Sequence, residues 1–259
     1  SALGSAVWNT FTMQASGTGI YISDSLHQFD ITASGPTDNA VTPMRHELGN
    51  VGQLPVQAKN GYKMKIVNST DVTVDDMWLV YQSENGEDYS PGSWVESNRG
   101  DWEYIIDKHT MPHVLKVQQD GSFKFMPWDY WENRNVGDEE TNPTPSFITT
   151  ATANRFINDI FLYRNRLGFL SDDNVFLSRA GQFFDFFNKS AIATANDDPI
   201  DISVSTTQDV ALHYTYQEAA GLVIFSETSQ YLLSTDSDLL APTTAKINQL
   251  TGFTSKPTL

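Results

Sequence analysis

The chain has 259 residues and no cysteine, and 32 acidic against 16 basic residues give it a formal net charge of −16. This length allows one or two domains with a buried core. The lack of cysteine excludes disulfides, thiolate metal sites and cysteine nucleophiles. The acidic charge argues against nucleic-acid binding through a basic surface, because such binding needs Lys and Arg to displace counterions. It does not exclude a protein that surrounds DNA and repels it.

The composition predicts a mainly β protein. Asp outnumbers Glu by 22 to 10, and Asp disfavours helix interiors because its short side chain competes for nearby backbone groups. Aromatic residues make up 12% of the chain, which suits strands and is too much for a disordered protein.

In chain order, five pairs of apolar runs flank short polar segments. They predict hairpins at 20–22 with 29–31, 62–67 with 77–81, 114–117 with 122–125, 167–170 with 175–177, and 222–225 with 230–233. Asp120-Gly121 is the strongest turn signal, because both residues tolerate the positive φ of a type I′ turn. The last four pairs recur about every 50 residues, as propeller blades do, although any β-rich chain yields hairpins at a similar density.

These patterns predict an antiparallel, hairpin-rich fold of propeller-like or multi-sheet modules with little helix. The segment 181–187 fits a single helical turn or a buried strand. Asn142-Pro143-Thr144-Pro145 breaks regular structure, so 133–150 is expected to be an exposed connection and a module boundary. We expect β modules at 1–90, 91–140 and 141–259, or one discontinuous propeller-like domain.

Charge is unevenly distributed in the last third of the chain. No Lys or Arg lies between Lys189 and Lys246, whereas this stretch holds eight acids: Asp197, Asp198, Asp201, Asp209, Glu218, Glu227, Asp236 and Asp238. A basic cluster precedes it: Arg155, Arg164, Arg166 and Arg179. Solvated strand faces and turns would explain the acids; the sharper hypothesis is one acidic surface facing a lumen. We expect Arg164, Arg166 and Arg179 to pair inside the subunit or at a subunit contact, with Asp172, Asp173 or Asp198.

No catalytic or cofactor-binding motif is present. The chain lacks a nucleophile elbow and a Walker loop. Asp197-Asp198-Pro199-Ile200-Asp201 resembles a calcium-loop fragment but departs from the EF-hand pattern at Pro199 and Ile200. We expect no cofactor, no metal site and no membrane-spanning segment, since no apolar run approaches 20 residues.

Aromatic residues crowd into 94–131, where they could form a core or a surface that stacks on sugars. The residues considered for this role are Trp94, Trp102, Trp128, Tyr130 and Trp131.

Over roughly 94–251 the chain resembles the family of tail tubular protein B, the tail nozzle proteins of short-tailed bacteriophages. The similar segments are 94–96, 110–115, 120–123, 131–134, 137–138, 142–147, 164–171, 174–181, 184–187, 198–201, 222–226 and 230–233. The first 90 residues resemble the family only at Leu54-Pro55 and 61–66.

The resemblance implies a structural virion protein of the tail, without enzymatic activity, in a hexameric ring through which the genome is ejected. Its implied partners are the adaptor ring, called tail tubular protein A, and tail fibres or spikes; DNA would pass without specific binding. The family's proteins are longer and the chain begins without Met, so we expect a central fragment, which could be monomeric alone. The stretch 190–245 is expected to line part of the conduit. The alternative is a polysaccharide-degrading or glycan-binding tail protein, which would need a carboxylate pair beside the aromatic cluster.

Overall fold

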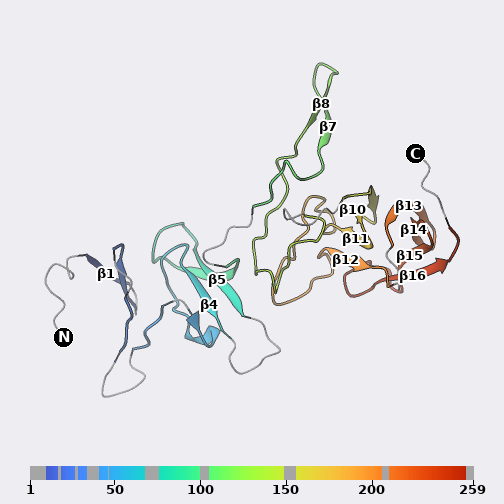
Figure 1. The fold of residues 1–259 in the computed structure, drawn as a ribbon. Helices are drawn as coiled ribbons and strands as arrows, with labels where there is room; N and C mark the ends of the chain where they lie inside the picture. The colour runs from blue at the N-terminus through green and yellow to red at the C-terminus, as the bar shows by residue number, and fades with distance from the viewer. Residues whose placement is uncertain are drawn as a thin grey trace. The chain divides into compact units, whose positions relative to one another are not determined.

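The computed structural model describes residues 10–16, 19–26, 29–33, 41–45, 47–67, 76–99, 105–148, 156–205 and 210–254. The chain forms two compact units, Ser1–Trp102 and Glu103–Leu259. Within the described residues the regular structure is strands and one short 3-10 turn, η1 (Val51–Gln53), with no α-helix (Figure 1). The prediction of a mainly β, antiparallel, hairpin-rich fold is therefore confirmed. Nowhere in this part of the chain is a helix long and apolar enough to cross a membrane.

The first unit contains a two-stranded and a four-stranded sheet. The two-stranded sheet pairs β1 (Phe11–Ser16) with β2 (Gly19–Asp24). The four-stranded sheet has the order β3-β4-β5-β6, with strands β3 (Glu47–Leu48), β4 (Lys63–Ile66), β5 (Met77–Ser83) and β6 (Gly92–Ser97). Its β3–β4 pair is parallel and the others are antiparallel.

A small core holds the four-stranded sheet together. Alternate residues of β4 and β5 point to one face, as the period of two in a strand requires, and Met64, Ile66 and Leu79 are buried there with Leu48. The Trp94 ring packs against this core, and its Nε1 donates to the carbonyl of Pro55 at 2.9 Å. Trp94 is therefore a packed residue of this unit.

The hairpin prediction at 20–22 with 29–31 is wrong. Residues 20–22 lie in β2, but the partner strand is β1, and 29–33 form no strand. Phe29 instead places its ring edge-to-face on Phe11, with centroids 5.0 Å apart, and Asp30 pairs with Arg45. The prediction failed because Phe11, Met13 and Ala15 alternate with polar residues, so β1 gives no continuous apolar run.

The second unit contains two consecutive four-stranded antiparallel sheets and a separate hairpin. The first sheet has the order β12-β11-β10-β9 and the second β13-β14-β15-β16. Their strands are β9 (Asp159–Tyr163), β10 (Arg166–Ser171), β11 (Asn174–Leu177), β12 (Ile200–Ser203), β13 (Leu212–Glu218), β14 (Gly221–Ser226), β15 (Gln230–Thr235) and β16 (Ala245–Thr251). The hairpin pairs β7 (Val114–Val117) with β8 (Phe123–Met126).

Four predicted hairpins are confirmed by strand pairing: β4–β5, β7–β8, β10–β11 and β14–β15. The turn at Asp120-Gly121 differs in type from the prediction, since only Gly121 has a positive φ, of 82°. The amide of Gly121 donates to the carbonyl of Gln118, and the amide of Gln118 donates to the carbonyl of Ser122. This pattern is a type I turn followed by a glycine bulge.

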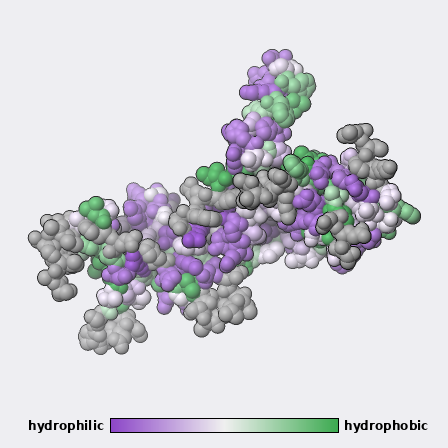
Figure 2. All heavy atoms as spheres, viewed as in Figure 1, coloured by the Kyte–Doolittle hydropathy of each residue, from purple (hydrophilic) through white to green (hydrophobic). Residues whose placement is uncertain are grey.

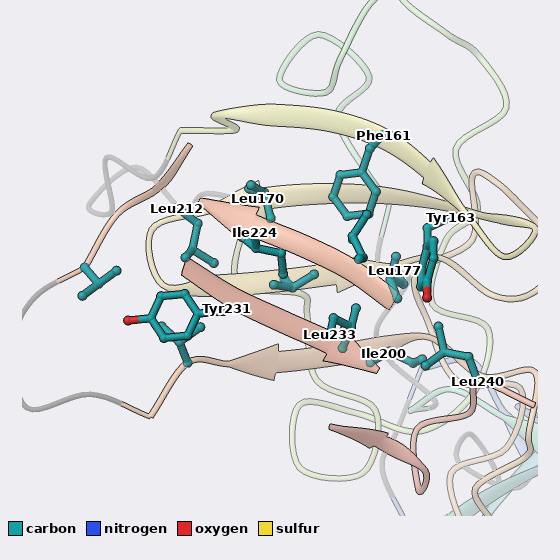
Figure 3. Packing of buried hydrophobic residues seen from close by; sticks show 14 residues of the cluster. Phe161, Tyr163, Leu170, Leu177, Ile200, Leu212, Ile224, Tyr231, Leu233 and Leu240 are labelled. Atoms are coloured by element: carbon teal, nitrogen blue, oxygen red, sulfur yellow. The ribbon is translucent and has the colours of Figure 1, made fainter. Parts of the chain in front are cut away.

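The two four-stranded sheets of the second unit pack face to face over one apolar core (Figure 3). Their side chains interdigitate: Leu170 and Leu177 come from the first sheet, and Ile224 and Leu233 from the second; all four are fully buried. Beside this interface β9 lies next to β13, and β12 lies next to β16. Consecutive four-stranded antiparallel sheets are the topology of propeller blades, and the propeller-like arrangement stays a prediction.

The other face of the first sheet is covered by an aromatic cluster. Phe169 and Phe176 point away from the first core and contact Trp131, Phe147 and Phe186. Because this sheet is buried on both faces, β10 and β11 read as nearly continuous apolar runs. Gly168 provides room in it, since a Cβ there would overlap the Phe161 ring on the neighbouring strand.

Two expectations about the connections are corrected. The segment 133–150 is not an exposed connection over its described part, 133–148, because Arg134, Asn142 and Phe147 are buried. The Asn142 side chain binds the carbonyls of Val136 and Asn188, which fixes a loop that the sequence marks as exposed. The segment 181–187 is neither helix nor strand but a series of turns that places aromatic rings in the cluster.

Candidate functional site

The predicted arginines come together with several acids at one end of the paired sheets. Arg164 and Asn165 form the two-residue turn between β9 and β10, both with positive φ, of 45° and 61°. Such a turn matches the twist of the two strands and favours Asn. Arg164 is exposed, and its Nη1 donates to the Asp238 carbonyl at 3.2 Å. The turn therefore touches the connection between β15 and β16.

Arg166 is a large and almost completely buried charged side chain, with 1% exposure. Its guanidinium donates to five backbone carbonyls, those of Ser178 (2.7 Å), Asn196 (3.0 Å), Asp197 (3.3 Å), Asp198 (2.6 Å) and Leu240 (3.2 Å). Burial lowers the pKa of Arg166, and the charges of Asp197 and Asp198 partly oppose that shift; the group stays protonated at any physiological pH. Arg166 thus ties β10 and the end of β11 to the loop 196–198 and to Leu240.

Arg179 makes the ion pairs of this cluster. Its Nη1 contacts Asp185 at 2.9 Å and its Nη2 contacts Asp197 at 2.7 Å. Although burial alone would lower it, the hydrogen bonds to these two carboxylates raise the pKa of Arg179. The bond from Arg179 in turn lowers the pKa of Asp197. We call Arg166, Arg179, Asp185, Asp197 and Asp198 the arginine cluster.

Asp198 is a fully buried carboxylate that caps its own loop. It accepts from the backbone amides of Lys189 (3.0 Å) and Ala195 (2.6 Å). Asp172 and Asp173, also expected as arginine partners, occupy the turn between β10 and β11. That turn is at the opposite end of β10 from Arg166, so within the subunit the arginines meet Asp185, Asp197 and Asp198.

The acid-only stretch is divided between two ends of the sheet. Glu218 precedes β14 and Glu227 follows it, and six residues of strand separate them by about 20 Å. Asp236 and Asp238, on the β15–β16 connection, lie at the Glu218 end because Leu222 pairs with Leu233. We call the set Asp197, Glu218, Asp236 and Asp238 the acidic end.

The remaining acids of the stretch have other settings. Asp201 lies on β12, is exposed and accepts from the Asn174 side chain at 2.8 Å. Glu227 is exposed, and its carboxylate is 3.8 Å from His213 Nε2. Asp209 and Arg155 lie outside the described residues.

The acidic end is partly neutralised by neighbouring cations. Asp197 pairs with Arg179, and Asp236 pairs with Lys246, the first base after the stretch. Glu218 and Asp238 are exposed. In the part of the chain that the structure describes, no three His, Asp or Glu side chains are grouped as metal ligands. The arginine cluster thus fixes the loop 196–198, and the acidic end presents a negative surface.

Sequence reasoning missed β9 and with it the role of Arg166. The run Ile160-Phe161-Leu162-Tyr163 followed by Arg164-Asn165 was a signal for another hairpin strand. No local pattern indicated that Arg166 would be buried, because its five acceptors come from distant segments.

Comparisons with known proteins identify the family. A family model described as bacteriophage nozzle protein matches residues 1–259. The chain is 36% identical over 222 residues to "Tail tubular protein gp12" of Escherichia phage T7. That alignment covers 86% of this chain and 26% of the relative, so the chain spans about a quarter of the relative's length. The chain belongs to the bacteriophage nozzle protein family, whose place is the virion tail.

Proposed function

We propose that the chain is a structural part of the ring-shaped tail nozzle below the adaptor, through which the phage genome is ejected. The observation that carries this proposal is the match of the nozzle family model to the whole chain. The architecture is consistent with a structural role, because one sheet is buried on both faces and the arginine cluster connects distant loops to it.

The proposed assembly is a hexameric ring that contacts the adaptor, tail tubular protein A, and the tail fibres or spikes. DNA passes through it without specific binding, and the chain performs no catalysis. The glycan alternative gains no support from the aromatic residues, because Trp131 is buried in a core cluster and Trp128 packs against it. Trp102 lies outside the described residues.

Within this ring, we place the acidic end of the second unit at the conduit or its approach. Non-specific DNA affinity comes from Lys and Arg that displace counterions from phosphates. Glu218 and Asp238 are exposed carboxylates in a stretch without bases, so a wall that carried them would repel DNA and let it slide. This proposal removes Glu227 from the candidate conduit-facing acids, because Glu227 lies at the other end of β14.

Charge reversal in the phage tests the conduit. Particles that carry Glu218→Lys and Asp238→Lys should eject their genome several-fold more slowly at low salt, with the difference shrinking as salt rises, because new lysines gain phosphate contacts. The matched control is Glu227→Lys, the same change at the other end of the strand. Equal ejection rates in wild-type particles, in the double variant and in the Glu227→Lys control would place the acidic end away from DNA.

Labelling tests the location separately. Electron microscopy of particles labelled with an antibody against this chain should show label at the tail below the head. Label confined to the head or to the fibre tips would contradict the nozzle proposal.

A further inference from the structure

The sequence contains two Asn-Gly pairs, and both lie beside the four-stranded sheet of the first unit. Asn60-Gly61 precedes β4, and Asn85-Gly86 lies in the loop 84–91 that joins β5 to β6. Asparagine is thermolabile, because the backbone nitrogen of the next residue can attack the side-chain carbonyl carbon within the same chain. Glycine in the next position leaves that nitrogen open to approach, since it carries no Cβ. The two pairs therefore share one chemistry, and their settings in the fold decide which of them reacts.

Asn60 is held in place by hydrogen bonds to other segments. Its Oδ1 accepts from the Ser83 amide at 3.1 Å, and its Nδ2 donates to the Gly86 carbonyl at 3.3 Å. The attacking nitrogen is also occupied, because the Gly61 amide donates to the Tyr81 carbonyl at 2.8 Å. Each hydrogen bond that must break before attack lowers the population able to react by about two- to tenfold. The fold therefore protects Asn60.

Asn85 lies in the open. Asn85, Gly86 and Glu87 are all exposed, on a unit whose visible surface is largely hydrophilic (Figure 2). The Asn85 side chain bonds within its own loop: Oδ1 accepts from the Glu87 amide at 2.9 Å and from the Ser90 hydroxyl at 2.5 Å. The Gly86 amide donates to the Ser83 carbonyl at 3.4 Å, a length at which a hydrogen bond is weak. The attacking nitrogen at this pair is therefore held much less firmly than that of Gly61.

The hydrogen bonds at Asn85 Oδ1 also suit the reaction. As the Gly86 nitrogen attacks Cγ, the carbonyl double bond opens and its oxygen takes up negative charge. The Glu87 amide and the Ser90 hydroxyl already donate to that oxygen, and donors that point at developing charge lower the barrier. These bonds stay in place during the attack, whereas the bond from Gly61 to the Tyr81 carbonyl has to break.

We propose that Asn85 is a site of spontaneous deamidation in the folded chain and that Asn60, which has the same neighbour, is not. The Gly86 nitrogen loses its proton to water and forms a bond to Cγ. The bond between Cγ and Nδ2 breaks, and Nδ2 leaves as ammonia with a proton from water. Water then opens the five-membered succinimide at either carbonyl, which leaves an aspartyl or isoaspartyl residue at position 85. The sum is the amide plus water giving the acid plus ammonia, without oxidation or reduction.

The reaction changes the loop 84–91. It converts the donor that faces Glu87 into a carboxylate, so two like charges meet where Asn85 Nδ2 and Glu87 Oε2 lie 3.0 Å apart. The same loop carries Tyr89, whose ring packs on that of Tyr21 in β2 with centroids 4.3 Å apart. Deamidation should therefore weaken the attachment of this loop to β2. Asn85→Asp, which copies the aspartyl product, should accordingly show faster hydrogen exchange at the Tyr89 amide than wild type, and equal exchange would contradict this consequence.

Peptide mapping of the 259-residue chain by mass spectrometry tests the site itself. During incubation of the folded chain at mildly alkaline pH, the Asn85 peptide should gain the mass of one deamidation at least about tenfold faster than the Asn60 peptide, because more and firmer hydrogen bonds hold Asn60-Gly61. In concentrated urea the two rates should converge, since unfolding removes both settings. Equal rates in the folded chain overturn the proposal, and so does a ratio that is the same in urea, which would assign the difference to neighbouring residues instead of the fold.

Two matched variants provide the second measurement. Each deamidation adds one negative charge, which takes the formal net charge from −16 to −17, so isoelectric focusing follows the reaction in the whole chain. Asn85→Gln keeps the amide but needs a larger ring for the same attack, and it should abolish most of the acidic product. Asn60→Gln, the control, should form that product as fast as wild type. An acidic product that persists in Asn85→Gln refutes the site, and product at position 85 without an isoaspartyl fraction refutes the succinimide route.

Discussion

Replacement of Arg166 by Met should remove a large share of the stability of the second unit. Met keeps the apolar stem of arginine, so the change mainly deletes the guanidinium group. Five backbone carbonyls then lose their donor. Hydrogen bonds to charged groups contribute about 1.5–3 kcal/mol each, but those shared by one group are not additive. Loss of one member of a buried charged network costs about 3–5 kcal/mol.

This loss is large relative to a total free energy of unfolding of about 5–15 kcal/mol. With about 3 °C of melting temperature for each kcal/mol in a unit of this size, the transition should move down by about 9–15 °C. The assay is thermal unfolding of the 259-residue chain, which is monitored by calorimetry and by near-ultraviolet circular dichroism. Arg164→Met is the matched control, because Arg164 is exposed and its Nη1 donates to the Asp238 carbonyl at 3.2 Å. The free energy of unfolding should change by no more than about 0.5 kcal/mol in this variant.

Arg166→Lys keeps the charge but cannot reach acceptors on several segments, since an ammonium is a compact donor without the planar fork of arginine. It should therefore lie between wild type and Arg166→Met. A shift for Arg166→Met that is no larger than that for Arg164→Met would refute the claim that Arg166 ties the loops together.

Three further predictions concern stability. Gly168→Val should lower the free energy of unfolding in urea by about 1–3 kcal/mol, because the new side chain meets the Phe161 ring. The control Gly252→Ala should leave the urea midpoint unchanged, since its Cβ meets only the Gln249 amide at 3.8 Å. Equal midpoints for the two variants would contradict this packing. Trp131→Ala should lower the free energy of unfolding by about 3–5 kcal/mol, because Trp131 lies in a core cluster. Tyr130→Ala should change stability little, since Tyr130 is exposed. The opposite order would support a surface that stacks on sugars. The hydrogen bond from Arg179 lowers the pKa of Asp197, so its contribution is complete above the ordinary carboxyl pKa and is lost as pH falls through the lowered value. The difference in melting temperature between wild type and Asp197→Asn should accordingly shrink between about pH 5 and pH 2, and a constant difference would show that Asp197 does not act through its charge.

Local sequence determined which hairpins form. The turns at Asp120-Gly121 and at 171–174 interrupt runs with strand character, and a tight turn dictates that the flanking runs pair. Sequence also indicated the family, since many short matches in the right order and spacing do not depend on knowing the fold. The pair at 20–22 with 29–31 failed because Phe11, Met13 and Ala15 of β1 alternate with polar residues, so no continuous apolar run marks β1 as the partner of β2.

Tertiary structure alone decided burial and the grouping of charges. Asn142 and Arg134 are polar residues, yet both are buried. Asn142 donates to the carbonyl of Asn188 on a distant segment, and Arg134 in turn donates to the carbonyl of Asn142 and to Glu139. The described acids of the stretch without bases separate in space because each antiparallel strand carries the chain to the other end of its sheet, as β14 does between Glu218 and Glu227. The net charge of −16 was fixed by the sequence; which carboxylates face solvent, cap a loop or pair with Arg179 depends on contacts between distant segments, which no local pattern encodes.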